Sequence, residues 1–216
     1  MRRVLPFLLL ATACSTSPSP PAASPSAPAV SAPSSTSAAP SATAASPCPS
    51  VSVPSDTGPE SNPPGDIPDN TAFVRYTPPS HRYSVEVPEG WARTVHGDGV
   101  TFTDKYNTVR VDLVAAAHAP TVSTARAQEV PAVAAASRCF SLRDVTTVRR
   151  NGENVVLVTY RADAAPDPVT GKTVRDDVER YEFWRGGTEA VLTLSGAQGA
   201  DNVDPWRTVS SSFRWS

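Results

Sequence analysis

The feature that most constrains the fold is a low-complexity tract over residues 15–50. Apart from Val30 and Cys48, every residue in it is Ser, Thr, Ala or Pro, and none is charged. Such a tract has too little apolar surface to offset the conformational entropy lost on folding, and its prolines favour an extended chain. The packed core must therefore come from the residues after the tract. We place the globular domain at residues 71–216, with residues 14–70 as a tether.

The segment before this tract has four parts in a fixed order. Two arginines precede the apolar run Val4–Leu10, the small residues 11–13 follow, and Cys14 comes directly after them. This order resembles the signal peptide and lipobox of bacterial lipoproteins. The resemblance implies that residues 1–13 are removed as a signal peptide. It also implies that the Cys14 thiol receives a diacylglyceryl group, a palmitate-type lipid anchor.

Two other interpretations of this segment are weaker. A membrane-spanning helix needs about 20 apolar residues, and here the apolar and small residues end at Cys14. A plain secretory signal ends in the same small residues but needs no cysteine at that position. Two acyl chains give stable anchoring where one does not. We therefore expect an extracytoplasmic protein held by lipid at the outer face of the cell membrane.

The domain itself carries no net charge. Residues 71–216 contain 17 Lys and Arg residues and 17 Asp and Glu residues. A nucleic-acid-binding surface would show a basic excess, so we expect no nucleic-acid partner. Nearly all of the basic residues are arginines, and together with abundant alanine this favours a GC-rich, actinobacterial coding sequence. A domain of about 150 residues buries roughly 68–70% of the surface that its unfolded chain exposes, which suits one self-sufficient domain.

Two cysteines remain if Cys14 carries lipid. Cys48 lies in the tract and Cys139 in the domain, and they form an even pair for an oxidising compartment. We predict a disulfide between them. The alternative is that Cys48 stays free or pairs between molecules, because the sequence does not show whether the two cysteines come close.

Alternation of apolar and polar residues predicts that most of the domain is strand. Residues 83–87 and 109–113 alternate as half-buried strands do, and Asn151–Gly152 is the strongest hairpin signature in the chain. Residues 155–160 are apolar on both faces, so this strand should be central and covered on both sides. Further strands are expected at residues 100–103, 140–148, 174–185 and 190–194.

The sequence also predicts two helices. Residues 121–137 are rich in Ala and lack strand alternation; Thr121 or Ser123 can cap them, and Pro131 should kink or end the helix. Residues 203–213 place apolar side chains along one helical stripe. A mixed sheet with helices on its faces is the simplest way to bury this order of elements.

Short motifs at both ends of the domain carry a family resemblance. Tyr83–Trp91 (YSVEVPEGW) resembles the opening strand and turn of the PsbP-like superfamily. Residues 190–194 (AVLTL) and 202–206 (NVDPW), with Ser212–Phe213, resemble its closing strand and helix. With the lipobox and the Ser/Pro tether, the chain is similar to actinobacterial LpqN-type lipoproteins, over residues 73–216 of the domain. The resemblance implies an α+β fold: an α/β/α sandwich whose central, mainly antiparallel sheet is flanked by two helices. It also implies a binding or assembly factor.

No motif for catalysis or cofactor binding is complete. Gly171–Thr173 lacks the earlier glycine of a phosphate loop and precedes a strand. His81, His96 and His118 have no zinc-binding spacing, and His96 and His118, beside turns, are expected to be exposed. Ser195 lies outside a Gly-x-Ser-x-Gly elbow. We therefore predict no catalytic, cofactor-binding or metal-binding residues and expect that the domain is not an enzyme.

Two groups of residues leave alternatives open. Five carboxylates gather around one loop and could bind calcium, but interleaved arginines favour a solvated hairpin tip of mixed charge. Four tryptophans could line a ligand cleft, although Trp91 and Trp206 fit core packing better. The carboxylates are Asp163, Asp167, Asp176, Asp177 and Glu179, and the other two tryptophans are Trp184 and Trp215.

These observations predict a cell-envelope lipoprotein whose domain binds or assembles with an envelope or extracellular protein. One alternative is a carrier of a small apolar ligand, which needs a cavity of at least roughly 300 Å³. Another is a hydrolase, which a buried carboxylate or histidine with a perturbed pKa in a cleft would favour. No cofactor is expected in the leading interpretation.

Overall fold

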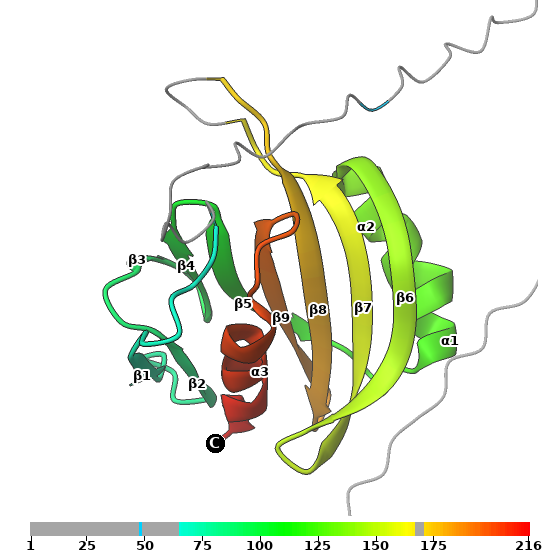
Figure 1. Cartoon of the computed structure of the whole chain (residues 1–216). Coiled ribbons are helices and arrows are strands. Elements are labelled where there is room, and N and C mark those ends of the chain that lie inside the picture. Colours follow the sequence, from blue (N-terminus) through cyan, green and yellow to red (C-terminus); the bar gives the residue numbers. More distant parts are fainter. Residues whose placement is uncertain (1–47, 49–64, 167–170) are drawn as a thin grey trace, which may run out of the picture. The chain divides into compact units, whose positions relative to one another are not determined.

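The computed structural model describes Cys48 and residues 65–166 and 171–216. Within this part, ten strands form two antiparallel sheets (Figure 1). The larger sheet has the order β3 (Ala92–His96), β4 (Gly99–Asp104), β5 (Asn107–Ala115), β9 (Thr188–Ala197), β8 (Arg175–Arg185), β7 (Glu153–Asp163) and β6 (Arg138–Arg150). The smaller sheet has the order β1 (Phe73–Tyr76), β2 (Tyr83–Pro88) and β10 (Arg214–Trp215).

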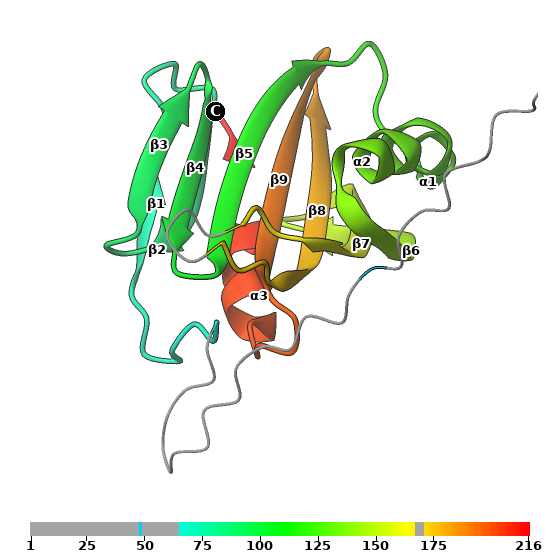
Figure 2. The same cartoon turned by 90° about the horizontal axis from the view of Figure 1, so that it is seen from above.

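Helices lie on both faces of the larger sheet. One is a continuous segment made of α1 (Val122–Thr124), a π-helical turn (Ala125–Glu129) and α2 (Val130–Ala136). The other, α3 (Val203–Ser212), lies on the opposite face (Figure 2). The predicted α+β fold, with a mainly antiparallel central sheet between two helices, is confirmed.

Strand β7 separates two hydrophobic cores. Val155 and Leu157 face the larger core, which α3 and the smaller sheet cover. Val156 and Val158 face a second core under the α1–α2 segment. This confirms that residues 155–160 are covered on both sides, because an apolar residue at every position can face a core only if both faces are buried. The expected central position is wrong, since β7 is next to the edge strand β6.

The first helical segment begins and continues for identifiable reasons. Thr121 caps it: its Oγ1 accepts a hydrogen bond from the Thr124 backbone N–H at 3.1 Å, and Thr124 Oγ1 accepts one from the Thr121 N–H at 2.9 Å. Pro131 does not end the helix, which runs on to Ala136. The π-helical turn ends at Glu129, two residues before Pro131. It is wider than an α-turn, and such insertions accommodate local interruptions in helical hydrogen bonding.

The turn after β6 is the predicted hairpin. Asn151 and Gly152 both have positive φ, +46° and +83°, as a type I′ turn requires. The sequence did not predict β1, β3 or β10. Most of β3 is exposed on both faces because it is an edge strand, so it shows no apolar alternation.

The Asn202 side chain holds the chain just before β1 against the domain. Its Oδ1 accepts a hydrogen bond from the Ile67 backbone N–H at 2.8 Å, and its Nδ2 donates to the Gly65 carbonyl at 3.0 Å. Nδ2 also lies 3.0 Å from Asn107 Oδ1, and Asn107 Nδ2 donates to the same Gly65 carbonyl at 2.9 Å. Both asparagines are buried. Residues 65–67 are thus fixed to β5 and to the start of α3.

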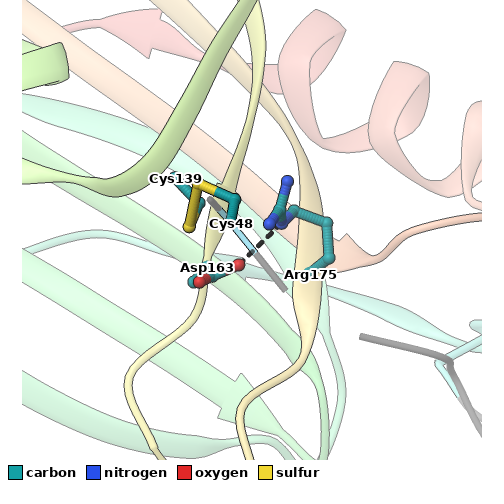
Figure 3. Close-up of a disulfide and its surroundings, with 4 residues drawn as sticks. All are labelled: Cys48, Cys139, Asp163 and Arg175. Carbon is teal, nitrogen blue, oxygen red and sulfur yellow. Dashed lines mark hydrogen bonds and ion pairs between the residues drawn. A yellow bond between two sulfur atoms is a disulfide. The ribbon is translucent and has the colours of Figure 1, made fainter. Parts of the chain in front are cut away.

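The structure joins Cys48 to Cys139, near the start of β6, by a disulfide with a Cα–Cα distance of 5.5 Å. The bond lies beside an ion pair between Asp163 and Arg175, whose Oδ1 and Nε atoms are 2.6 Å apart (Figure 3). Cys14 lies outside the described residues.

Candidate functional site

One face of the larger sheet is only partly covered. The α1–α2 segment packs on β6, β7 and β8 through the second core. On β3, β4, β5 and β9 the side chains of this face are mostly exposed or half-buried, whereas the alternate residues of β4, β5 and β9 are mostly buried against the larger core. We call this surface the open face. It comprises Ala92, Thr94, His96, Thr101, Thr103, Thr108, Arg110, Asp112, Val114, Glu189, Thr193 and Ser195.

At one end of the open face, His96 joins a polar array. Its Nε2 lies 3.1 Å from Thr101 Oγ1 and its Nδ1 lies 3.7 Å from Asp112 Oδ1. Arg110 donates two hydrogen bonds to the Asp112 carboxylate, at 2.7 and 2.9 Å. A Cβ at Gly99 would come within 2.5 Å of the imidazole, so only glycine leaves room for this ring position.

Local sequence spacing could not reveal this polar array, because its members come from three strands. His96 faces Gly99, which precedes Thr101 on β4, and Asp112 lies on β5 beside them. Their proximity depends on the register of two consecutive hairpins. His96 is half-buried, so its expected exposure is wrong, while His118 is exposed as predicted. A hydroxyl, an imidazole and a carboxylate in this order could transfer a proton. However, none of these residues lines the small pocket beside Trp91 that is described below.

Where the open face meets the helix, four charged side chains come together. Arg180 of β8 forms an ion pair with Glu129 of the π-helical turn. Glu182 and Glu189 interact electrostatically with both of these residues. We call Glu129, Arg180, Glu182 and Glu189 the carboxylate cluster. It contains three carboxylates for one guanidinium.

Glu182 is the unusual member of the carboxylate cluster. It is only 2% exposed, and its Oε1 atom has no hydrogen-bond partner among the described residues. Burial, reinforced by the nearby Glu189 and Glu129 carboxylates, raises the pKa of Glu182 to about 8. Burial also raises the pKa of Glu189 above its ordinary value. Glu182 therefore holds a proton at neutral pH.

The carboxylates near the 163–175 loop are paired mainly with arginines. Asp163 lies 2.6 Å from Arg175, and Asp177 lies 2.6 Å from Arg161. The predicted mixed charge is thus present, but the predicted solvation is wrong, because the Asp163 side chain is only 2% exposed. Asp176 is also buried, and this burial raises its pKa to about 7. Asp167 lies outside the described residues.

None of the described His, Cys, Asp and Glu residues form a group of three or more that could hold a metal ion. Gly171–Thr173 is followed by strand β8, where a phosphate loop would have a helix. Ser195 lies within β9 and hydrogen-bonds to Asp176. No nucleophile and base of a known motif are brought together at these described positions.

A small pocket of about 270 Å³ lies beside the fixed residues 65–67. Three carboxylates line it together with Trp91, the one tryptophan at this pocket. Its remaining lining is largely polar or small, and it is smaller than the roughly 300 Å³ at which ligand pockets begin. The lining residues are Asp66, Ile67, Pro68, Thr71, Glu89, Gly90, Trp91, Asp104 and Asn107.

The other tryptophans have packing roles. Trp206 is buried in the larger core, and Trp91 also packs against that core, as predicted. Trp184 donates its Nε1–H to the Ala116 carbonyl at 2.8 Å. Trp215 packs edge-on against Phe213, with ring centroids 5.4 Å apart. Of the four tryptophans, only Trp91 lines the described pocket.

Comparisons with known proteins give fold similarities at low identity. No family model and no curated protein matches the chain. Among solved structures, the chain is similar to cyanobacterial PsbP (CyanoP) from Synechocystis, with 19% identity and a TM-score of 0.49, covering 70% of this chain and 98% of the other. It is similar to the Ran-binding protein Mog1p of Saccharomyces cerevisiae, with 10% identity, a TM-score of 0.45 and coverage of 68% and 96%.

A third similarity is to LpqN, a Mycobacterium tuberculosis protein involved in cell envelope biogenesis. Its identity is 13% and its TM-score 0.37, with 67% of this chain and 84% of LpqN covered. For a Bacteroides thetaiotaomicron structure, at 9% identity and a TM-score of 0.45, the chain spans only 48% of the other protein. At these identities and TM-scores, none of the similarities assigns a function. In the described residues, no helix has the length and apolar character needed to cross a membrane.

Proposed function

We propose that this chain is a lipid-anchored lipoprotein of the cell envelope whose domain binds a partner protein through the open face. The anchoring part of the proposal is supported by the order of charge, apolar run, small residues and Cys14 in the sequence. A diacylated Cys14 would supply the two acyl chains that stable attachment needs.

The open face is the observation that carries the binding part. Its strands are firmly built, because their opposite side is packed into the larger core. Its outer side chains are mainly hydroxyl and charged groups, and they are exposed or half-buried. A rigid, polar and broad surface suits a protein partner, since protein interfaces need area and many polar contacts.

Two alternative functions have less support. A carrier of an apolar ligand needs an apolar cavity, and the described pocket is small and bordered by three carboxylates. A hydrolase is favoured by buried carboxylates of raised pKa, which Glu182 and Asp176 are. Neither of them lines the described pocket, and the polar array around His96 includes neither. Asp176 hydrogen-bonds to Ser195, but this pair lies outside both the pocket and the polar array.

Site-specific photo-crosslinking in intact cells tests the binding part. A photoreactive amino acid replaces Thr103 on the open face; the control carries it at Thr208, an exposed threonine on α3. We expect a discrete crosslinked protein from position 103 that is absent from position 208. The same products from both positions, or none from position 103, would contradict binding through this face.

Detergent partitioning tests the anchor independently. The wild-type chain should enter the detergent phase, and Cys14→Ala should remain in the aqueous phase because it lacks both acyl chains. Wild-type protein found wholly in the aqueous phase, with an unmodified N-terminus, would refute lipid anchoring.

A further inference from the structure

The carboxylate cluster contains three carboxyl groups and one guanidinium. Arg180 pairs with Glu129, and its Nη1 also reaches Thr193 Oγ1 at 3.4 Å. Glu182 is left with a buried oxygen that has no partner among the described residues. A buried polar atom without a partner is costly, and most such atoms in proteins find a hydrogen-bond partner. Glu182 Oε1 thus lacks a hydrogen-bond partner in the described residues, as does the buried Nε of Arg180 in the same cluster.

The cluster reaches the protein surface at Glu129, Arg180 and Glu189, which are half-buried, whereas Glu182 is buried. Glu182 lies at the floor, in register with the buried Val191 of β9. The side chains of Glu129 and Glu189 are both half-buried and lie nearer the surface. Glu189 pairs in register with Val114 on β5 and with Trp184 on β8, so these three side chains form a row on the same face. Val114 is 45% exposed. The aliphatic part of a long partner side chain could lie against Val114 and Trp184, with its charged end towards Glu189.

We infer that the carboxylate cluster binds a cationic side chain, lysine or arginine, of the partner protein; the inference rests on the proposed protein-binding function. A guanidinium or ammonium group would donate to Glu182 and favour its ionised form. A bare metal ion fits less well, because the Arg180 guanidinium already occupies the cluster and no metal-type group of three ligands is formed by the described residues.

Binding of a cation should depend on pH in a defined direction. The charged groups that interact with Glu182 are Glu189 on β9, Glu129 from the helical segment and Arg180 on its own strand. Asp112 on β5 lies in the same register row, beyond Val191 of β9. A cation favours the ionised form of Glu182, whose pKa is about 8 in the free protein. Affinity for the cation should therefore rise as the pH is raised from about 6 to about 8.

The experiment uses the full chain in detergent and two small probes. N-acetyl-arginine amide carries the guanidinium, and N-acetyl-citrulline amide has nearly the same shape without the charge. NMR titration should show shifts at Glu182, Glu189 and their neighbours with the arginine probe only. At pH 8, Glu182→Gln should weaken this binding at least about tenfold, and the variant should lose the rise in affinity with pH. Glu153→Gln, which changes an exposed glutamate beside the hairpin, is the matched control and should bind like wild type.

Each result decides the question. Equal binding of the citrulline probe, or unchanged arginine binding by Glu182→Gln, would overturn the cation site. A folded Glu182→Gln variant, verified by its unchanged amide spectrum away from the cluster, excludes misfolding as the cause of lost binding. If the crosslinking at Thr103 succeeds and the arginine probe does not bind, the partner-binding function stands and this inference fails. If the arginine probe binds without any crosslink, the cation site stands and the function fails.

Discussion

Replacing Glu182 by glutamine should stabilise the domain, and by more at pH 8 than at pH 5. The folded state raises the pKa of Glu182 from an ordinary value of 4.5 to about 8. Between these two values the folded protein keeps a proton that the unfolded chain releases. Stability from this group is therefore fully present below pH 4.5 and is lost as the pH rises towards 8. Glutamine is neutral at every pH, so the variant does not suffer this loss.

The size of the effect follows from the same two pKa values. A single group changes the free energy of unfolding by at most about 1.4 kcal/mol per pH unit. Across the window from 4.5 to 8, the difference between variant and wild type should grow to at most about 5 kcal/mol. Between about pH 5 and pH 7 it should grow by about 2–3 kcal/mol. Above about pH 8 it should level off.

Urea unfolding of both proteins at intervals from pH 5 to pH 8 measures this difference. Glu189 and Asp176 also have raised pKa values and remain in the variant, so its own curve should still slope. The informative quantity is the gap between the two curves. Glu153→Gln, at an exposed position, should run parallel to wild type. A constant gap between Glu182→Gln and wild type would refute the assignment of a buried, protonated glutamate.

Three further predictions concern other parts of the chain. We propose that the Cys48–Cys139 bond forms in the native envelope protein, so that unreduced peptide maps show the linked peptides. Because the bond spans 91 positions, Cys139→Ser should lower the free energy of unfolding by up to about 4–5 kcal/mol. Two alkylatable thiols in fresh protein would count against the bond. Asn202→Ala removes a buried amide with three hydrogen-bond partners and should lower the free energy of unfolding by about 2–4 kcal/mol. Hydrogen exchange at the Ile67 amide should become faster; unchanged exchange would show that Asn202 does not hold residues 65–67 against the domain. Esterase, peptidase and phosphatase screens should give no turnover above a heat-killed control, and turnover abolished by His96→Asn would instead assign catalysis to the polar array.

Most of the fold could be predicted because its strands carry their own pattern. Tyr83, Val85 and Val87 alternate with polar residues, and the doubly apolar residues 155–160 indicate two cores. The Asn151–Gly152 turn fixes one hairpin register locally. The edge strand β3 was not predicted, because its side chains face solvent on both sides and its sequence therefore shows no alternation of apolar and polar residues.

The charged sites could not be predicted, because burial of a polar residue depends on neighbours distant in sequence. In the sequence, Glu182 is one charged residue in the alternating segment 174–185, and nothing local separates it from the half-buried Glu179. Its burial arises from β7, β9 and the helical segment, which come from three separate stretches. The same holds for Asp163. Its sequence position predicts a solvated hairpin tip, but in the structure it is buried and paired with Arg175.

The position of the carboxylate cluster follows from the dimensions of the elements. Seven strands spaced at about 4.8 Å make a sheet roughly 30 Å wide, whereas one helix with its side chains is about 10–12 Å across. The α1–α2 segment can therefore cover only about three strands, and it packs on β6, β7 and β8. The side chains beyond it must tolerate water, which explains the hydroxyl-rich open face. At the boundary, on β8 and β9, side chains lie partly under the helix and partly at the surface. Charged groups placed there lose enough solvent to shift their pKa values, while Glu189 and Glu129 stay half-buried at the surface. A partner seated on the open face would meet Glu189 and Glu129 first, and a cationic side chain from that partner would complete the hydrogen bonding that the fold leaves open at Glu182.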